Sequence, residues 1–134
     1  MRLLVLLVSM VVISCGDDHP PKILQTSLPA EVADGTGPFV VTAVVTDNRG
    51  VSEVSLLMTP DLRVAFEQRP MLETAESAYQ TSIGPFSPGS VRYLIVEAVD
   101  TDGNHAWYPH PDLSAETGCV VSNELCWHEF SVLE

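Results

Sequence analysis

The side chains best suited to binding a metal ion lie at alternate positions after a long apolar run at 91–99. Asp100, Asp102 and Asn104 match the first, third and fifth ligands of a calcium-binding loop, and hard cations prefer such oxygen ligands. The match then ends, because His105 stands where such a loop has a glycine and Pro111 where it has a bidentate acid. The residue types indicate calcium, while the spacing argues against a complete loop.

A second turn carries Asp47 and Asn48, followed by Arg49 and Gly50. If the two turns lie at the same end of the fold, their oxygens converge with those of 100–104 on one cation. The alternative is that the Asp and Asn side chains accept hydrogen bonds from backbone N–H groups of their own turns, which is a common role of these residues. The sequence leaves both hypotheses open, and it predicts no cofactor other than calcium.

Side chains that act in catalysis do not form a recognisable set. His105, His110 and His128 have neither the spacing of a zinc motif nor a helix that would place them on one face. Ser87 and Ser90 lack the context of a nucleophile elbow. The sequence therefore favours a non-enzymatic protein, with a small exported hydrolase or transfer enzyme as the alternative.

The N-terminal segment has the composition of an export signal. Met1 and Arg2 give a positive start, and the apolar run 3–13 is interrupted only by Ser9. A spanning helix needs about 20 residues, so this run fits a secretory signal better than a permanent membrane span. A buried core helix is the alternative, but the run has no polar face.

The stretch Val12-Ile13-Ser14-Cys15 resembles the lipobox of bacterial lipoproteins. The resemblance implies a signal peptide at 1–14, lipid on Cys15, a short tether at 15–21, and a membrane as partner through the lipid anchor. Two or three acyl chains, at about 0.8 kcal/mol per buried methylene, make such an anchor effectively permanent. Gly16 stands where an aspartate would favour retention in the inner membrane of enteric bacteria, so an outer-membrane location is favoured.

The remaining cysteines form an even pair. If Cys15 carries lipid, Cys119 and Cys126 are left together in an oxidising compartment, where a disulfide is expected. Closing so small a ring is worth roughly 2 to 3 kcal/mol in the chain-entropy model. A zinc site is disfavoured because no further Cys or well-spaced His accompanies the pair.

The segment 105–126 is long for a loop in a compact domain, where about 12 to 15 residues is already unusual without function or disorder. Trp107 and Tyr108 lie near its start, and Trp127 follows directly. Aromatic side chains on a stapled loop suit a binding surface for a protein or a carbohydrate. The alternative is that the two tryptophans cover an open edge of the fold.

After Pro21 the chain reads as short alternating segments separated by turn residues, which is typical of an all-β fold. The clearest segments, 39–46 and 51–58, are expected to form a hairpin through the turn at 47–50. Seven strands are predicted in total, at 23–28, 39–46, 51–58, 63–67, 79–83, 91–99 and 127–133.

The succession VVTAVVTDNRGVSEVSLLM, YQTSIG and VRYLIVEAVDTDGN looks like the immunoglobulin-like and fibronectin type III-like domains of bacterial exported proteins. The resemblance implies one antiparallel β-sandwich at 22–134, with Greek-key connections and an insertion at 105–126, used as a spacer, stalk or adhesive module. Calcium at the end loops, as in cadherin-like modules, would make it a calcium-stabilised adhesion module.

The charge balance excludes some partners. Six Lys+Arg against eighteen Asp+Glu give a net charge of −12 at pH 7. Such a field repels phosphate backbones and anionic lipid headgroups, so nucleic-acid binding is not expected. The sequence predicts a lipid-anchored protein of the bacterial cell envelope that acts as a structural or binding module for a protein or carbohydrate.

Overall fold

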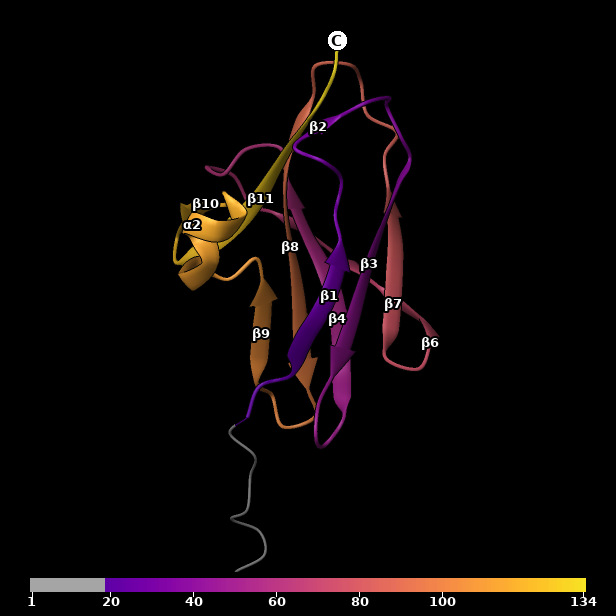
Figure 1. Ribbon diagram of the computed structural model, residues 1–134, viewed down its shortest axis with the longest axis vertical. Helices are drawn as coiled ribbons and strands as arrows, with labels where there is room; N and C mark the ends of the chain where they lie inside the picture. The colour runs from indigo at the N-terminus through magenta and orange to yellow at the C-terminus, as the bar shows by residue number, and fades with distance from the viewer. Residues whose placement is uncertain (1–18) are drawn as a thin grey trace, which may run out of the picture.

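The computed structural model describes residues 19–134 of the protein (Figure 1). The predicted signal peptide, Cys15 and the first part of the predicted tether lie outside these residues. Within 19–134 the fold is all-β apart from two short helical turns, and no helix there is long and apolar enough to cross a membrane.

The strands form two sheets. The smaller sheet has four antiparallel strands in the order β1 (Lys22–Ser27), β3 (Phe39–Thr46), β7 (Ala78–Ile83) and β6 (Leu72–Ala75). The larger sheet has seven strands, and its main path is β10 (Val120–Ser122), β11 (Leu125–Val132), β8 (Val91–Asp100), β4 (Val51–Thr59) and β5 (Glu67–Pro70). Two short strands complete it: β2 (Val32–Ala33) pairs parallel with β11, and β9 (His105–Tyr108) pairs antiparallel with β8.

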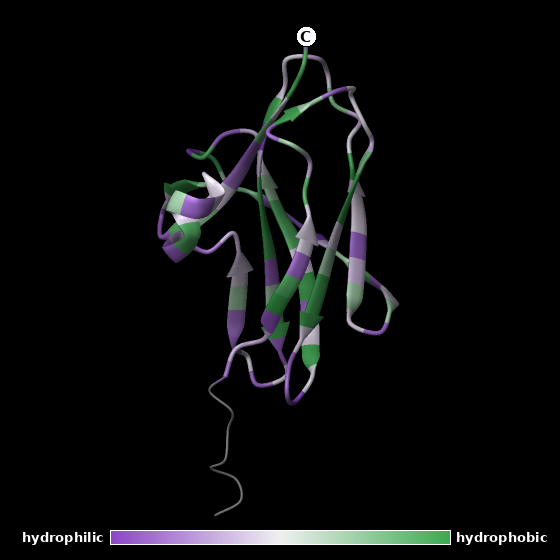
Figure 2. Ribbon diagram, viewed as in Figure 1, coloured by the Kyte–Doolittle hydropathy of each residue, from purple (hydrophilic) through white to green (hydrophobic). Residues whose placement is uncertain are grey.

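One hydrophobic core joins the two sheets. In β3 the alternate residues Val41, Ala43 and Val45 are buried, because successive side chains of a strand point to opposite faces. They share a cluster with inward-facing residues of the larger sheet, namely Val54, Leu56 and Met58 of β4, Leu94, Val96 and Ala98 of β8, and Phe130 of β11. Figure 2 shows the hydrophobic stretches along β3, β4 and β8. The sheets therefore pack face to face in a sandwich-like arrangement.

The predicted hairpin of 39–46 with 51–58 is wrong, although both strands are present. β3 pairs with β1 and β7 in the four-stranded sheet, while β4 pairs with β8 and β5 in the seven-stranded sheet. The turn at 47–50 therefore carries the chain from one sheet to the other. Alternation shows that both strands face the same core, but it does not show which strands are hydrogen-bonded to each other.

The predicted edge strand at 63–67 is also wrong. Residues 60–66 form a turn, because the Asp61 carboxylate accepts hydrogen bonds from the backbone N–H of Arg63 at 2.9 Å and from its guanidinium. The edge strand β5 begins only at Glu67, and the chain then crosses to β6 of the other sheet through Met71, which is 5% exposed.

The segment 105–126 is an ordered excursion and not a plain loop. It contains β9, the 3₁₀ turn η2 (Pro111–Leu113), the helical turn α2 (Ser114–Thr117) and β10. β9 pairs with the second half of β8 and β11 with the first half, while β4 occupies the opposite edge of β8. One edge of β8 is therefore paired with two separate strands, β11 along its first half and β9 along its second.

Candidate functional site

The outer face of the seven-stranded sheet carries a second apolar cluster. The β8 residues between those of the core, among them Ile95, point away from the four-stranded sheet. Ile95 packs there with Leu57 of β4 and Trp127 of β11, and these three side chains are at most 5% exposed. Partly buried side chains pack around them, namely Leu62, Tyr93, Trp107 and Leu125. A sheet face that would normally be solvated therefore holds a small core of its own.

The turn at 60–66 covers part of this cluster. It is fixed at its start by the buried Thr59, whose hydroxyl donates to the carbonyl of Asp61 at 2.7 Å. The guanidinium of Arg63 lies beside Asp61 and, with the Arg63 backbone N–H, lowers the pKa of that carboxyl from 3.8 to about 2. The turn ends with the Phe66 ring 5.8 Å from the ring of Trp127.

Phe66 and Val64 keep large exposed surfaces, at 45% and 54%. The Phe66 ring lies against the buried Trp127, so part of this exposed apolar surface has a packed aromatic side chain beneath it. Aromatic side chains are enriched at the centres of protein interfaces.

Trp127, one of the three aromatic residues of the predicted binding surface, is buried in the structure. It is 5% exposed because β11 points it onto the sheet face, where Leu57 and Ile95 pack against it. The sequence showed an aromatic residue beside a long segment, but burial of a side chain depends on the strand pairing that places it.

Trp107 and Tyr108 point in opposite directions, because they are neighbours in a strand. Trp107 lies on the outer face, where its indole Nε1 donates to Glu97 Oε2 at 2.8 Å and its ring stacks on His105 at 5.7 Å. Tyr108, opposite the inward-facing Val96, lines the seam toward β1 instead. The predicted aromatic surface of Trp107, Tyr108 and Trp127 is therefore divided.

Carboxylates and amides border the apolar cluster. Gln68 Nε2 donates to Glu53 Oε1 at 3.0 Å and to Ser55 Oγ at 3.2 Å, and Ser55 is the cross-strand neighbour of Glu97. At the other side Glu129 accepts a hydrogen bond from Tyr93, which raises the pKa of that phenol above its usual 10.0. The exposed apolar centre therefore has an acidic rim.

The turns of the predicted calcium site do lie at one end of the molecule. The backbone N–H of Thr101 donates to the carbonyl of Gly50 at 3.1 Å, and Arg49 Nε lies 3.4 Å from Asp102 Oδ2. Figure 1 shows both turns at the end where β1 begins.

The oxygens of these turns are used mainly to cap the backbone. Asp47 Oδ2 accepts from the N–H groups of Arg49 and Gly50, and Asp100 Oδ1 accepts from those of Asp102 and Asn104. Residues 19–134 hold no group of three or more His, Cys, Asp or Glu side chains placed to bind a metal. Asn48 is exposed at the edge of a shallow hollow. The capping hypothesis thus describes the geometry, and calcium binding stays a prediction.

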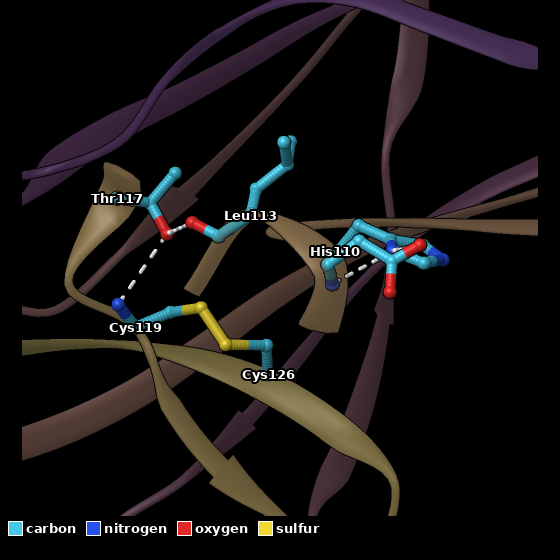
Figure 3. The surroundings of a disulfide bond; sticks show 6 residues. His110, Leu113, Thr117, Cys119 and Cys126 are labelled. Carbon is cyan, nitrogen blue, oxygen red and sulfur yellow. Dashed lines mark hydrogen bonds and ion pairs between the residues drawn. A yellow bond between two sulfur atoms is a disulfide. The ribbon is translucent and has the colours of Figure 1, made fainter. Parts of the chain in front are cut away.

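The predicted disulfide joins Cys119 and Cys126, with 5.5 Å between their Cα atoms (Figure 3). It ties the end of the helical excursion to β11 directly beside Trp127. The approach to Cys119 is ordered locally, since its N–H donates to Thr117 Oγ1 and Thr117 donates to the carbonyl of Leu113 at 2.8 Å. Gly118, at a φ of 72°, ends α2 in the left-handed conformation that favours glycine. The disulfide therefore helps position Trp127 in the outer apolar cluster.

The three histidines have separate partners. His105 lies 3.2 Å from Glu97, His110 accepts from the Asp112 N–H, and His128 Nε2 lies 2.6 Å from the Pro29 carbonyl. His128 lines a hollow of about 410 Å³ with Glu31, Glu116 and Tyr108, but neither serine nor cysteine is among the residues that line it.

No family model matches this chain, and no curated protein matches it.

Proposed function

We propose that the protein is a lipid-anchored lipoprotein of the bacterial cell envelope, whose immunoglobulin-like domain binds a protein partner without catalysing a reaction. The observation that carries the proposal is the outer face of the seven-stranded sheet. There Phe66 is exposed against the buried Trp127, with the exposed Val64 in the same turn and carboxylates around the cluster.

The strand order supports an immunoglobulin-like domain. In that fold one sheet has the order A-B-E-D and the other contains C, F and G, with an additional C′ in variable-type domains. The order β1-β3-β7-β6 follows the first pattern, and β11-β8-β4-β5 follows the second as G-F-C-C′. Two features depart from antibody domains, because β4 carries no tryptophan and the disulfide lies within one sheet and its excursion.

The lipobox-like residues support the anchor, and the tether would set the orientation. Lys22, where β1 begins, follows Cys15 by seven residues, which span at most about 25 Å when fully extended. The end with the turns at 47–50 and 100–104 would then face the membrane. The outer faces of both sheets would then lie roughly perpendicular to the membrane plane, where other proteins of the envelope can reach them.

The chemistry of the site favours a protein over a carbohydrate. Trp107 has its indole N–H engaged by Glu97 and one ring face covered by His105, so it offers little open surface for stacking on a sugar. An apolar centre with an acidic rim fits a partner that presents an apolar side chain surrounded by Lys or Arg.

The test combines anchoring with capture. Metabolic labelling with a palmitate analogue should mark the protein, and Cys15→Ala should abolish the label. A photo-crosslinking residue at position 66 should become covalently joined to a partner from the envelope. In a separate measurement, the tagged Phe66→Ala variant should capture at least tenfold less of that partner than the unaltered tagged protein.

The matched control is Leu24→Ala, because Leu24 is 56% exposed but lies on β1 of the other sheet. It should leave capture unchanged. Equal capture by Phe66→Ala and the unaltered protein would refute the contact face, and label that persists in Cys15→Ala would refute the anchor.

A further inference from the structure

A groove follows one seam of the sandwich, where the open edge of β1 faces the open edge of β9. Among the described strands, β1 pairs only with β3 and β9 only with β8, and the two strands lie beside each other across the seam (Figure 1). Two hollows of about 370 and 410 Å³ lie along the seam, and both are lined by Thr26 and Tyr108. We call the two hollows together the seam groove.

Thr26 directs its backbone groups into the seam groove. The N–H of Val45 in β3 donates to the carbonyl of Ser77 at 2.9 Å, on the side of β3 that faces β7. Because the direction of these groups alternates along a strand, those of Ala43 also point toward β7, and those of its cross-strand neighbour Thr26 point away from β3. An unpaired N–H and C=O at the edge of a sheet form hydrogen bonds with an extended backbone that lies beside them.

Two carboxylates mark the end of the seam groove next to α2, where Glu31 and Glu116 line the larger hollow. The backbone carbonyl of Glu31 is held by the N–H of Ser131 at 2.8 Å, and its Oε1 lies 3.6 Å from where a Cβ would stand on Gly118, at the end of α2. Within residues 19–134 neither carboxylate forms an ion pair. This end of the groove therefore has an uncompensated negative potential, which attracts a cation.

The other end of the seam groove has a different character. The described residues that line the smaller hollow carry no charge, and Ile23 and Tyr108 give it apolar surface. Tyr108 lies where the two hollows meet, so its ring is available to an apolar side chain and its hydroxyl to a polar group. Along the direction of β1 the groove thus changes from apolar to acidic.

We propose that the seam groove binds an extended segment of a partner polypeptide, with a Lys or Arg side chain of that segment between Glu31 and Glu116. Charge complementarity selects the basic side chain, and the open edge at Thr26 selects an extended backbone. A free metal ion does not fit, because residues 19–134 hold no group of three or more His, Cys, Asp or Glu side chains placed to bind one. The inference is independent of the lipid anchor, and the groove is a separate site from the face around Phe66.

The experiment measures binding of a defined peptide to the full chain in non-ionic detergent micelles. The probe is a short fluorescent peptide of alternating Val and Lys, acetylated and amidated at its ends, and the readout is fluorescence anisotropy. The double variant Glu31→Gln with Glu116→Gln should bind the peptide at least fivefold more weakly than the unaltered protein. The matched control is Asp34→Asn with Glu76→Gln, which removes the same charge from exposed positions outside the groove and should leave binding unchanged.

A second peptide tests the backbone contact. The same sequence with N-methylated Val residues cannot donate backbone hydrogen bonds at those positions, and it should bind at least fivefold more weakly. Equal weakening by the two double variants would overturn the inference, because it would show attraction to the overall charge, and so would equal binding of the methylated and unmethylated peptides. Peptide binding that is lost in Phe66→Ala but kept in the Glu31 and Glu116 double variant would place the peptide on the outer face, which overturns the groove and supports the contact face. Circular dichroism of each variant checks that the fold is kept.

Discussion

Replacing Trp107 should lower stability through two separable contributions. Trp107→Ala removes a ring packed against the buried Leu57, Ile95 and Trp127, and it removes the hydrogen bond to Glu97. A Trp→Ala change at a fully buried position lowers the unfolding free energy by about 3 to 5 kcal/mol. Because Trp107 is partly exposed, we expect its packing to contribute about 2 to 3 kcal/mol. The hydrogen bond to a carboxylate adds about 1 kcal/mol, because Glu97 keeps His105 as a neighbour.

The two contributions are measured with a pair of variants in urea unfolding. Trp107→Ala should lose about 3 to 4 kcal/mol of unfolding free energy, whereas Trp107→Phe keeps most of the packing and should lose about 1 to 2 kcal/mol. Neither variant should change the slope of the transition, because the surface exposed on unfolding is nearly the same. Phe66→Ala, which removes an exposed ring, should cost less than about 1 kcal/mol.

A loss below about 1 kcal/mol for Trp107→Ala would refute the packing argument and return Trp107 to the role of an exposed contact residue. Partner capture by the same variants completes the distinction. If Trp107 mainly supports the face, capture should follow the folded fraction of each variant. If Trp107 contacts the partner, capture by Trp107→Ala should fall under conditions where that variant is fully folded.

Three further outcomes are expected. If the turns bind calcium, millimolar calcium should raise the melting temperature, and Asp100→Asn should remove the effect; an unchanged melting curve would end this hypothesis. Reduction of the Cys119–Cys126 disulfide should lower the unfolding free energy by roughly 2 to 3 kcal/mol, and equal stability before and after reduction would contradict it. The raised pKa of Tyr93 contributes stability that is fully present below pH 10 and is lost as the pH rises through the pKa of the folded state. Glu129→Gln should make this loss of stability at alkaline pH smaller. Identical alkaline unfolding curves for Glu129→Gln and the unaltered protein would count against the Tyr93–Glu129 hydrogen bond.

The core strands could be predicted because their sequences meet two conditions at once. The alternation in 39–46, 51–58 and 91–99 matches the period of a strand, and turn residues such as Asp47 and Gly50 end it abruptly. These strands appear within one residue of the predicted limits. The pairing could not be predicted in the same way, because alternation defines which face is buried and is equally compatible with a hairpin or with a crossing between sheets.

The residues of the outer face were missed because their signal was assigned to another feature. The segment 63–67, which contains Val64 and Phe66, is interpreted from the sequence as an edge strand polar enough to face solvent. In the structure the Asp61–Arg63 interaction turns the chain, the Phe66 ring lies against Trp127, and Leu62 packs against the same cluster. The burial of Trp127 in turn depends on the place of β11 beside β8, which involves residues more than thirty positions apart in the sequence.

The helical excursion explains how one sheet comes to present a supported aromatic surface. β9 runs antiparallel to β8 from Val99 to Val96, so the chain already travels toward the first half of β8 when β9 ends. The excursion through η2 and α2 leaves this edge, and the chain returns as β11, which pairs with residues 91–94 and directs Trp127 onto the outer face. The Cys119–Cys126 disulfide limits how far this part of β11 can separate from the excursion. The ordered excursion and its disulfide would therefore act on the proposed contact face indirectly, by holding the Trp127 side chain against which Phe66 packs.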